Sequence, residues 1–137
     1  MQPQDIATVE TDLFNHREVK PHFINECCFG EDFAAWLRDR VSDLAGFGFS
    51  EPIQEDYGWG FWANYGKQSF WVALSYVGWG PTEAPGQWVV CFACDPGLNL
   101  FKRIFTKPDL SAMETLRARI RKELETKEGI RIVQDAF

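Results

Sequence analysis

Residues 59–77 read WGFWANYGKQSFWVALSYV, and this stretch decides the fold. Aromatic and β-branched residues at this density favour strands, and the short turn at 66–68 divides the stretch into two strands, 59–65 and 69–77. A long turn rich in glycine and proline follows, and residues 87–94 then have the same strand character. The three strands predict the antiparallel centre of a sheet.

Two amphipathic segments flank this centre. Apolar side chains recur at helical spacing from Phe33 to Leu44, and again in a segment that starts near Asp109 and is closed by Gly129. Further strands are predicted at 22–29, at 49–57 (weakened by Pro52) and at 130–133, whereas 98–105 is either a short strand or an irregular packed stretch.

The order of these elements predicts a single α+β domain over residues 1–137, in which residues 1–12 form a loose N-terminal arm. We expect an antiparallel sheet of about four to six strands in a meander, with two helices packed on one face.

Composition and charge restrict the function. The chain has 14 Lys and Arg against 20 Asp and Glu, which gives a formal net charge of −6 and argues against a nucleic-acid partner. Its apolar runs are all far shorter than the roughly 20 residues of a membrane-spanning helix. Residues 1–10 are polar and acidic, unlike a signal peptide. We therefore expect a cytoplasmic protein with reduced cysteines and no membrane partner.

The cysteines and histidines carry little chemistry. Cys27 and Cys28 are adjacent, and Cys91 and Cys94 are three apart, so that each pair points to opposite faces of a strand. We expect buried thiols, no metal and no cofactor; a metal site that combines the two pairs is the alternative. A histidine base would have to be His16 or His22, and Ser50 only half matches a nucleophile elbow. An enzyme is therefore the less favoured hypothesis.

Glu51, Glu55 and Asp56 form an acidic cluster beside aromatic residues. On one strand Glu51 and Glu55 would share a face with their Cα atoms about 13 Å apart, too far for the carboxylate pair of a retaining glycosidase. Three interpretations remain: an acidic edge strand that discourages edge-to-edge pairing, an acidic patch for a basic partner, or an enzyme site.

The predicted sheet is apolar on both faces. Trp62 and Trp71 fall on the opposite phase from the main core set and can be cross-strand neighbours. Two helices cover only one face, so the second face is covered by the N-terminal arm, by residues 98–105, by a second copy of the chain, by a protein partner or by a small ligand. The predicted partner-binding residues are Glu51, Glu55, Asp56, Trp62 and Trp71.

The pattern Glu55-Asp56-x-Gly58-Trp59, together with the order of elements over 22–134, resembles small bacterial domains of unknown function, some of which look like immunity proteins of toxin–antitoxin competition systems. The resemblance implies a cytoplasmic, acidic, non-enzymatic partner binder and carries no catalytic residue.

We thus predict a small protein-binding domain of this kind, which uses the acidic strand and the aromatic sheet face to bind a protein partner or a second copy of itself. The alternatives are an enzyme or ligand-binding domain with a pocket near Glu55, Trp59 and Trp62, and a purely structural homodimer.

Overall fold

The computed structural model describes residues 4–24, 28–77, 86–95 and 110–135. In these residues seven strands form one antiparallel sheet in the order β2-β4-β5-β6-β1-β7, and β3 also pairs with β4. The strands are β1 (Gln4–Thr11), β2 (Phe47–Phe49), β3 (Ile53–Glu55), β4 (Gly58–Tyr65), β5 (Gln68–Tyr76), β6 (Gly86–Asp95) and β7 (Arg131–Asp135), and the helices are α1 (Glu31–Val41) and α3 (Leu110–Thr126).

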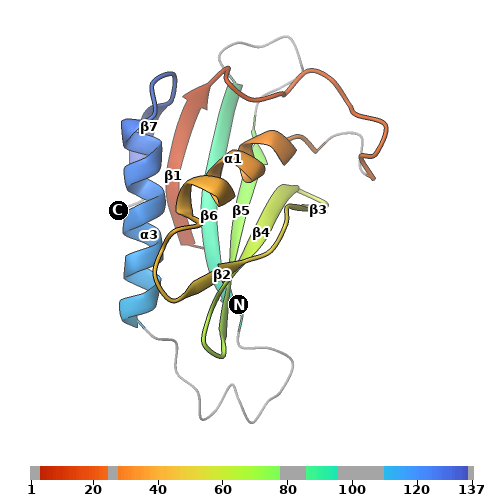
Figure 1. Ribbon diagram of the computed structural model, residues 1–137. Helices are drawn as coiled ribbons and strands as arrows, with labels where there is room; N and C mark the ends of the chain where they lie inside the picture. The colour runs from red at the N-terminus through yellow and green to blue at the C-terminus, as the bar shows by residue number, and fades with distance from the viewer. Residues whose placement is uncertain (1–3, 25–27, 78–85, 96–109, 136–137) are drawn as a thin grey trace.

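Both helices pack on one face of this sheet. In Figure 1, α1 lies across the central strands and α3 runs along the side of the sheet formed by β1 and β7. The predicted α+β class with an antiparallel sheet is confirmed, and the expected hairpin of residues 59–77 is formed by β4 and β5. None of the helices in the described residues is long and apolar enough to span a membrane.

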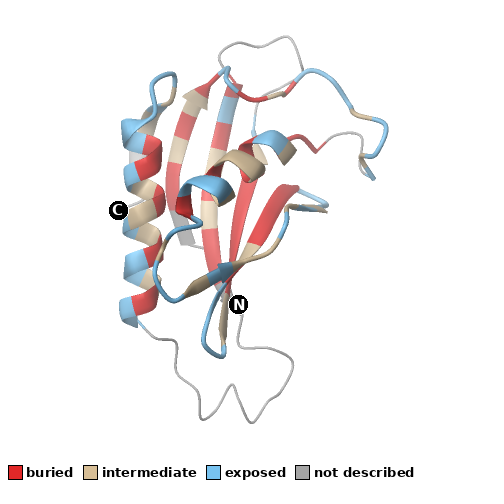
Figure 2. Cartoon of the chain, in the orientation of Figure 1, coloured by how far each residue is buried: buried red, intermediate tan, exposed pale blue. Residues whose placement is uncertain are grey.

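The core lies between the helices and the facing side of the sheet. Side chains of alternate strand residues meet the apolar stripes of both helices there and are almost completely buried, including Phe61, Phe70, Val72, Leu74, Val90 and Phe92 from the sheet and Leu37, Val41, Leu116, Ile120 and Leu124 from the helices. Figure 2 shows that β4 and β5 are buried along most of their length. Each such side chain contributes about 1.5–3 kcal/mol through burial, so the core accounts for this layer arrangement.

Charged residues join the two helices at the edge of this core. The Glu123 carboxylate accepts hydrogen bonds from Arg40 and Arg119, each at 2.9 Å, and Arg119 also pairs with Asp43 at 2.7 Å. Burial of Glu123 would raise its pKa, but the hydrogen bonds from Arg119 and Arg40 outweigh burial and hold that pKa below its usual value. The ion pairs therefore fix α1 against α3 while the Glu123 carboxylate is ionised.

The prediction of a loose arm is wrong for residues 4–11, which form β1 between β6 and β7. Ala7 and Val9 are fully buried in the core, whereas Thr8 and Glu10 alternate with them on the opposite side. The period-two pattern of a half-buried strand is thus present in this acidic segment, and pairing on both edges satisfies its backbone.

The strand predicted at 22–29 is not formed by the described part of that segment, because side chains satisfy its backbone groups instead. The Gln54 side chain accepts a hydrogen bond from the Ile24 amide and donates one to the Cys28 carbonyl. The Trp59 indole N–H donates to the same carbonyl at 2.9 Å. Phe23 packs against the core and Phe29 is buried in it, whereas Ile24 is exposed, so the described part of the segment lies beside the core as a loop.

The single strand predicted at 49–57 is divided into β2 and β3. At the break, the Ser50 hydroxyl accepts a hydrogen bond from the Trp62 amide at 2.8 Å, and the Ser50 amide donates to the Trp62 carbonyl at 3.0 Å. Pro52, which has no amide hydrogen, follows in the gap. The strand predicted at 130–133 is confirmed as β7, and residues 98–105 lie outside the described residues.

Candidate functional site

The sheet face opposite the helices, which we call the outer face, carries the second set of alternating side chains. Register places Trp62 opposite Trp71, Trp71 opposite Ala93, and Ala73 opposite Cys91. Because cross-strand partners in an antiparallel sheet point to the same side, these residues share the outer face with Ser75. The sequence prediction that Trp62 and Trp71 have the opposite phase from the core is confirmed.

Trp62 and Trp71 form a contacting pair on this face. Their ring centroids are 4.9 Å apart, with an interplanar angle of 59°. The Trp71 side of the pair is largely shielded, since that residue is only 7% exposed. A Cβ atom at Gly60 would lie 2.4 Å from the Trp71 ring, so this indole packs directly against the glycine of the neighbouring strand.

Tyr57 contacts the Trp71 indole at its N–H group. Tyr57 lies in the turn between β3 and β4, and its hydroxyl accepts a hydrogen bond from the Trp71 indole N–H. Partial burial raises the pKa of Tyr57, and the negative charge of Glu55 raises it further against the opposing effect of the Trp71 hydrogen bond. The Tyr57 phenol is therefore neutral at physiological pH, and its position relative to Trp71 is fixed.

Beside this pair the outer face is hollowed into a pocket of about 340 Å³. Tyr57 and Trp71 line it on the outer face, and Phe92 of the core also borders it. Small residues on β5 and β6 leave the space beside them: Ala73, Ser75, Cys91 and Ala93. The lining is almost entirely apolar. The arrangement can receive an apolar group against an indole face.

The predicted acidic residues are divided between two places. Glu55 ends β3 opposite Gly58, on the outer side of the sheet, and Asp56 follows in the turn that leads to Tyr57. Glu51 lies before β3, and its carboxylate is 3.4 Å from the Arg38 guanidinium on α1. The expectation that Glu51 and Glu55 share the face of one strand is wrong, because the strand is interrupted between them.

In the described residues Glu55, Trp59 and Trp62 do not line one pocket, because Trp59 and Trp62 lie on opposite faces of β4. Trp59 belongs to the core side of β4, where it is 5% exposed and bonded to the Cys28 carbonyl. Trp62 is three residues further along the same strand and therefore points to the outer face. The structure brings Trp62 and Trp71 together on the outer face, places Glu55 on the outer side of β3, and leaves Trp59 and Glu51 elsewhere.

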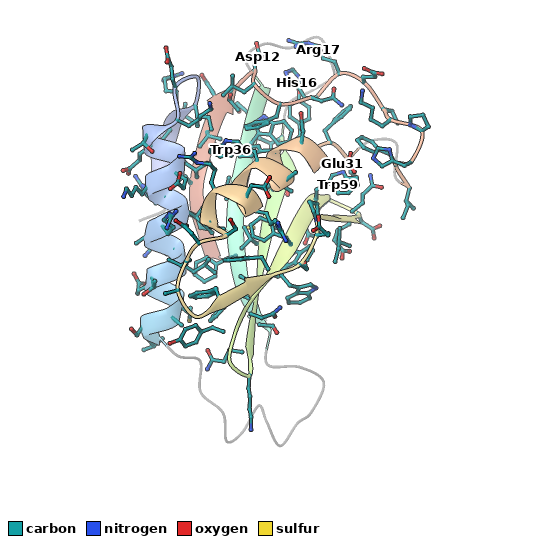
Figure 3. The ribbon with its side chains drawn as sticks, in the orientation of Figure 1. Asp12, His16, Arg17, Glu31, Trp36 and Trp59 are labelled. Atoms are coloured by element: carbon teal, nitrogen blue, oxygen red, sulfur yellow. The ribbon has the colours of Figure 1, made fainter. Side chains whose placement is uncertain are left out.

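The two histidines are also apart from the pocket. His16 is completely buried, its Nε2 is 2.8 Å from Asp12, and its ring stacks on Tyr76. The hydrogen bond with His16 lowers the pKa of Asp12, which also accepts the Gly86 amide. Figure 3 places Asp12, His16 and Arg17 at one end of the sheet, in the segment that follows β1.

The second histidine, His22, is exposed and lies 2.7 Å from Glu31, at the first turn of α1. Cys28 is a buried thiol, and Cys91 is a partly exposed thiol that lines the pocket. Cys94 belongs to β6, and Cys27 lies outside the described residues. Among the residues that the structure describes, no group of three or more His, Cys, Asp or Glu side chains is placed to hold a metal ion.

Sequence reasoning missed the residues that make the hollow. These residues are small and lie on the outer face of two adjacent strands: Ala73, Ser75, Cys91 and Ala93. Small residues at alternate positions of two neighbouring strands are a sequence pattern that could have indicated a hollow. No sequence pattern indicates the contact of Tyr57 with Trp71, because the turn between β3 and β4 positions Tyr57.

Comparison of the chain with protein-family models, with curated proteins and with solved structures found no match. The resemblance to immunity-type domains therefore stays a prediction.

Proposed function

We propose that this chain is a cytosolic, non-enzymatic binding domain, and that the pocket on its outer face receives an apolar part of a side chain from a protein partner. An immunity-type domain that occupies its target is one form of this function. The partner-binding residues in this proposal are Trp71 and Trp62 with Glu55 and Asp56, to which the geometry adds Tyr57.

The observation that carries the proposal is the pocket itself. An apolar hollow with an indole at its side suits the anchor side chain of a partner, because protein interfaces concentrate their binding energy in a few well-packed anchors that fill such hollows. Tyr57 and Trp71 already hold each other, so a partner meets a fixed surface and loses little free energy in ordering it.

The pocket chemistry favours binding over catalysis. Acid–base catalysis near neutral pH needs a group whose pKa lies close to the working pH. The Tyr57 hydroxyl has its pKa raised away from that range and is engaged by the Trp71 indole. Among the described lining residues, the Ser75 hydroxyl and the Cys91 thiol are the other polar side-chain groups, and both histidines lie elsewhere.

A small apolar ligand is the second candidate function. The pocket volume of about 340 Å³ falls in the range of small-molecule sites, which is about 300–1,000 Å³. Such a ligand would occupy the same space beside Trp71.

A peptide-display selection tests the proposal. A random peptide library is selected on the intact protein and counter-selected on Ala93→Leu and Ser75→Leu, two variants that fill the pocket. Asn64→Leu adds the same side chain to β4 outside this pocket and is the matched control. Circular dichroism establishes that each variant is folded.

We expect peptides that bind the wild type and Asn64→Leu but bind Ala93→Leu and Ser75→Leu at least tenfold more weakly. Peptides that bind all four proteins equally, or an empty selection, contradict the proposal. Sedimentation equilibrium of the same proteins distinguishes a second copy as partner: a dimer that Ala93→Leu dissociates makes self-association the function of the pocket.

A further inference from the structure

We propose that the side chain which enters the pocket is a lysine or arginine of a basic partner segment. This inference rests on the proposed function and names the chemistry of the partner. In this arrangement the aliphatic stem lies in the pocket against Trp71, and the cationic head stays at the mouth beside Glu55 and Asp56.

Two acidic residues precede the pocket residue Tyr57 in the chain. They are Glu55 and Asp56, both exposed. Glu55 ends β3 opposite Gly58 on the outer side of the sheet, next to the turn that holds Tyr57, and its negative charge raises the pKa of the Tyr57 phenol. Glu55 and Asp56 each have a further interaction within the chain, so the proposal requires only that their negative charges lie near the mouth.

The apolar interior of the pocket favours an aliphatic group. Ala73 and Ala93 are each 3% exposed, and their methyl groups offer no hydrogen bond to a polar head. Lysine and arginine lay their methylene stems along apolar surface and keep their charged ends in water or beside an acid. Trp71 lines the same pocket and adds apolar surface along which such a stem can lie.

Other side chains fit this combination less well. A leucine or phenylalanine would fill the interior but would remove water from Glu55 and Asp56 without supplying a counter-charge. An acidic side chain would be repelled by the same two carboxylates. The formal net charge of −6 acts in the same direction, because it attracts a basic partner during association.

Glu51 provides an internal control for charge at the site. It lies four residues before Glu55, but its carboxylate pairs with Arg38 of α1 on the other side of the sheet edge. Replacement of Glu51 removes the same charge from the chain without touching the mouth of the pocket.

The test uses peptides from the selection described above, measured by fluorescence anisotropy with the full-length wild type, Glu55→Gln, Asp56→Asn and Glu51→Gln. We expect the selected peptides to be enriched in Lys and Arg. We also expect Glu55→Gln and Asp56→Asn each to weaken binding about two- to fivefold, as exposed charge pairs do, and Glu51→Gln to leave it unchanged. Replacement of the anchoring Lys by norleucine, which keeps the stem and removes the charge, is expected to abolish the dependence on Glu55.

Pocket-dependent peptides without enrichment in Lys and Arg, or affinities that do not change in Glu55→Gln and Asp56→Asn, overturn this inference and leave the proposed function standing. Equal losses in Glu51→Gln and Glu55→Gln overturn it as well, since they indicate a long-range effect of net charge. An absence of pocket-dependent peptides, or a dimer that accounts for all occupancy of the pocket, overturns both the inference and the binding of a foreign partner.

Discussion

The Trp71 indole lies so close to Gly60 on the neighbouring strand that a methyl group at Gly60 would be 2.4 Å from the ring and 2.4 Å from the Val72 carbonyl oxygen. Such distances are well below van der Waals contact. Gly60 is therefore the position that lets the indole pack closely against the sheet, and the indole lines one side of the pocket.

Gly60→Ala is expected to lower the free energy of unfolding by about 2–3 kcal/mol, because the new methyl group must displace both a large ring and a backbone carbonyl. Urea unfolding followed by circular dichroism measures this change. Gly48→Ala on β2 is the control, since a Cβ there meets no atom within 4 Å, and we expect a change within about 0.5 kcal/mol. Similar effects of the two substitutions would contradict the placement of Trp71.

Tyr57→Phe is expected to destabilise the protein by about 1 kcal/mol. The substitution leaves the largely buried Trp71 indole N–H without its acceptor, and a lost hydrogen bond of this kind has about that effect. Tyr65→Phe removes a hydroxyl from an exposed tyrosine at the far end of β4 and should change stability by less than about 0.5 kcal/mol. Equal stability of Tyr57→Phe and the wild type would indicate that the hydroxyl does not hold the indole.

Glu123→Gln is expected to lower stability at pH 7 by about 1–2 kcal/mol, because Arg40 and Arg119 lose their shared carboxylate. The pKa of Glu123 is lower in the folded protein than in the unfolded chain, so its contribution is complete above the unfolded value near 4.5 and is lost as the pH falls through the folded value. The difference between wild type and variant should therefore shrink as the pH is lowered from 5 toward 2.

The exposed pair of Arg121 and Glu125, which lies on the same helix, is the control for that measurement. Glu125→Gln should change stability by less than about 0.5 kcal/mol. A difference between Glu123→Gln and the wild type that stays constant from pH 7 to pH 2 would show that the effect does not come from the ionised carboxylate.

Iodoacetamide is expected to modify Cys91 faster than Cys28 in the native protein. Cys91 lines the open pocket, whereas Cys28 is 5% exposed and its thiol donates to the Asp56 carbonyl. Peptide mapping by mass spectrometry at several times gives both rates. Ala93→Leu should slow the modification of Cys91 alone, and faster labelling of Cys28 in the wild type would contradict the position of the pocket.

The sequence was sufficient to predict the two faces of the central sheet. The alternation in 59–77 separates Phe61 and Val72 from Trp62 and Trp71, and the structure keeps that separation because a strand has a side-chain period of two. β1 was missed although Ala7 and Val9 carry the same signal. Their segment is acidic and lies near the N-terminus, and only its position between β6 and β7 supplies the pairing that makes it a strand.

The pocket could be predicted only in part. Trp62 and Trp71 were identified from their phase, but the hollow depends on the register that sets Ala73 opposite Cys91 and on the turn that brings the Tyr57 hydroxyl to the indole N–H. The acidic cluster was misjudged because hydrogen bonds between Ser50 and Trp62 interrupt the strand, which sends Glu51 to Arg38. Tertiary contacts of this kind leave no local pattern in the sequence.

The indole N–H signals of the tryptophans test the central claim most directly, in ¹⁵N-labelled protein titrated with a selected peptide. Trp71 lines the pocket on the outer face, whereas Trp59 and Trp88 are buried on the core face. We predict that the Trp71 signal shifts in proportion to occupancy while the signals of Trp59 and Trp88 stay in place. Shifts of Trp59 and Trp88 with an unchanged Trp71 would contradict binding at the outer face.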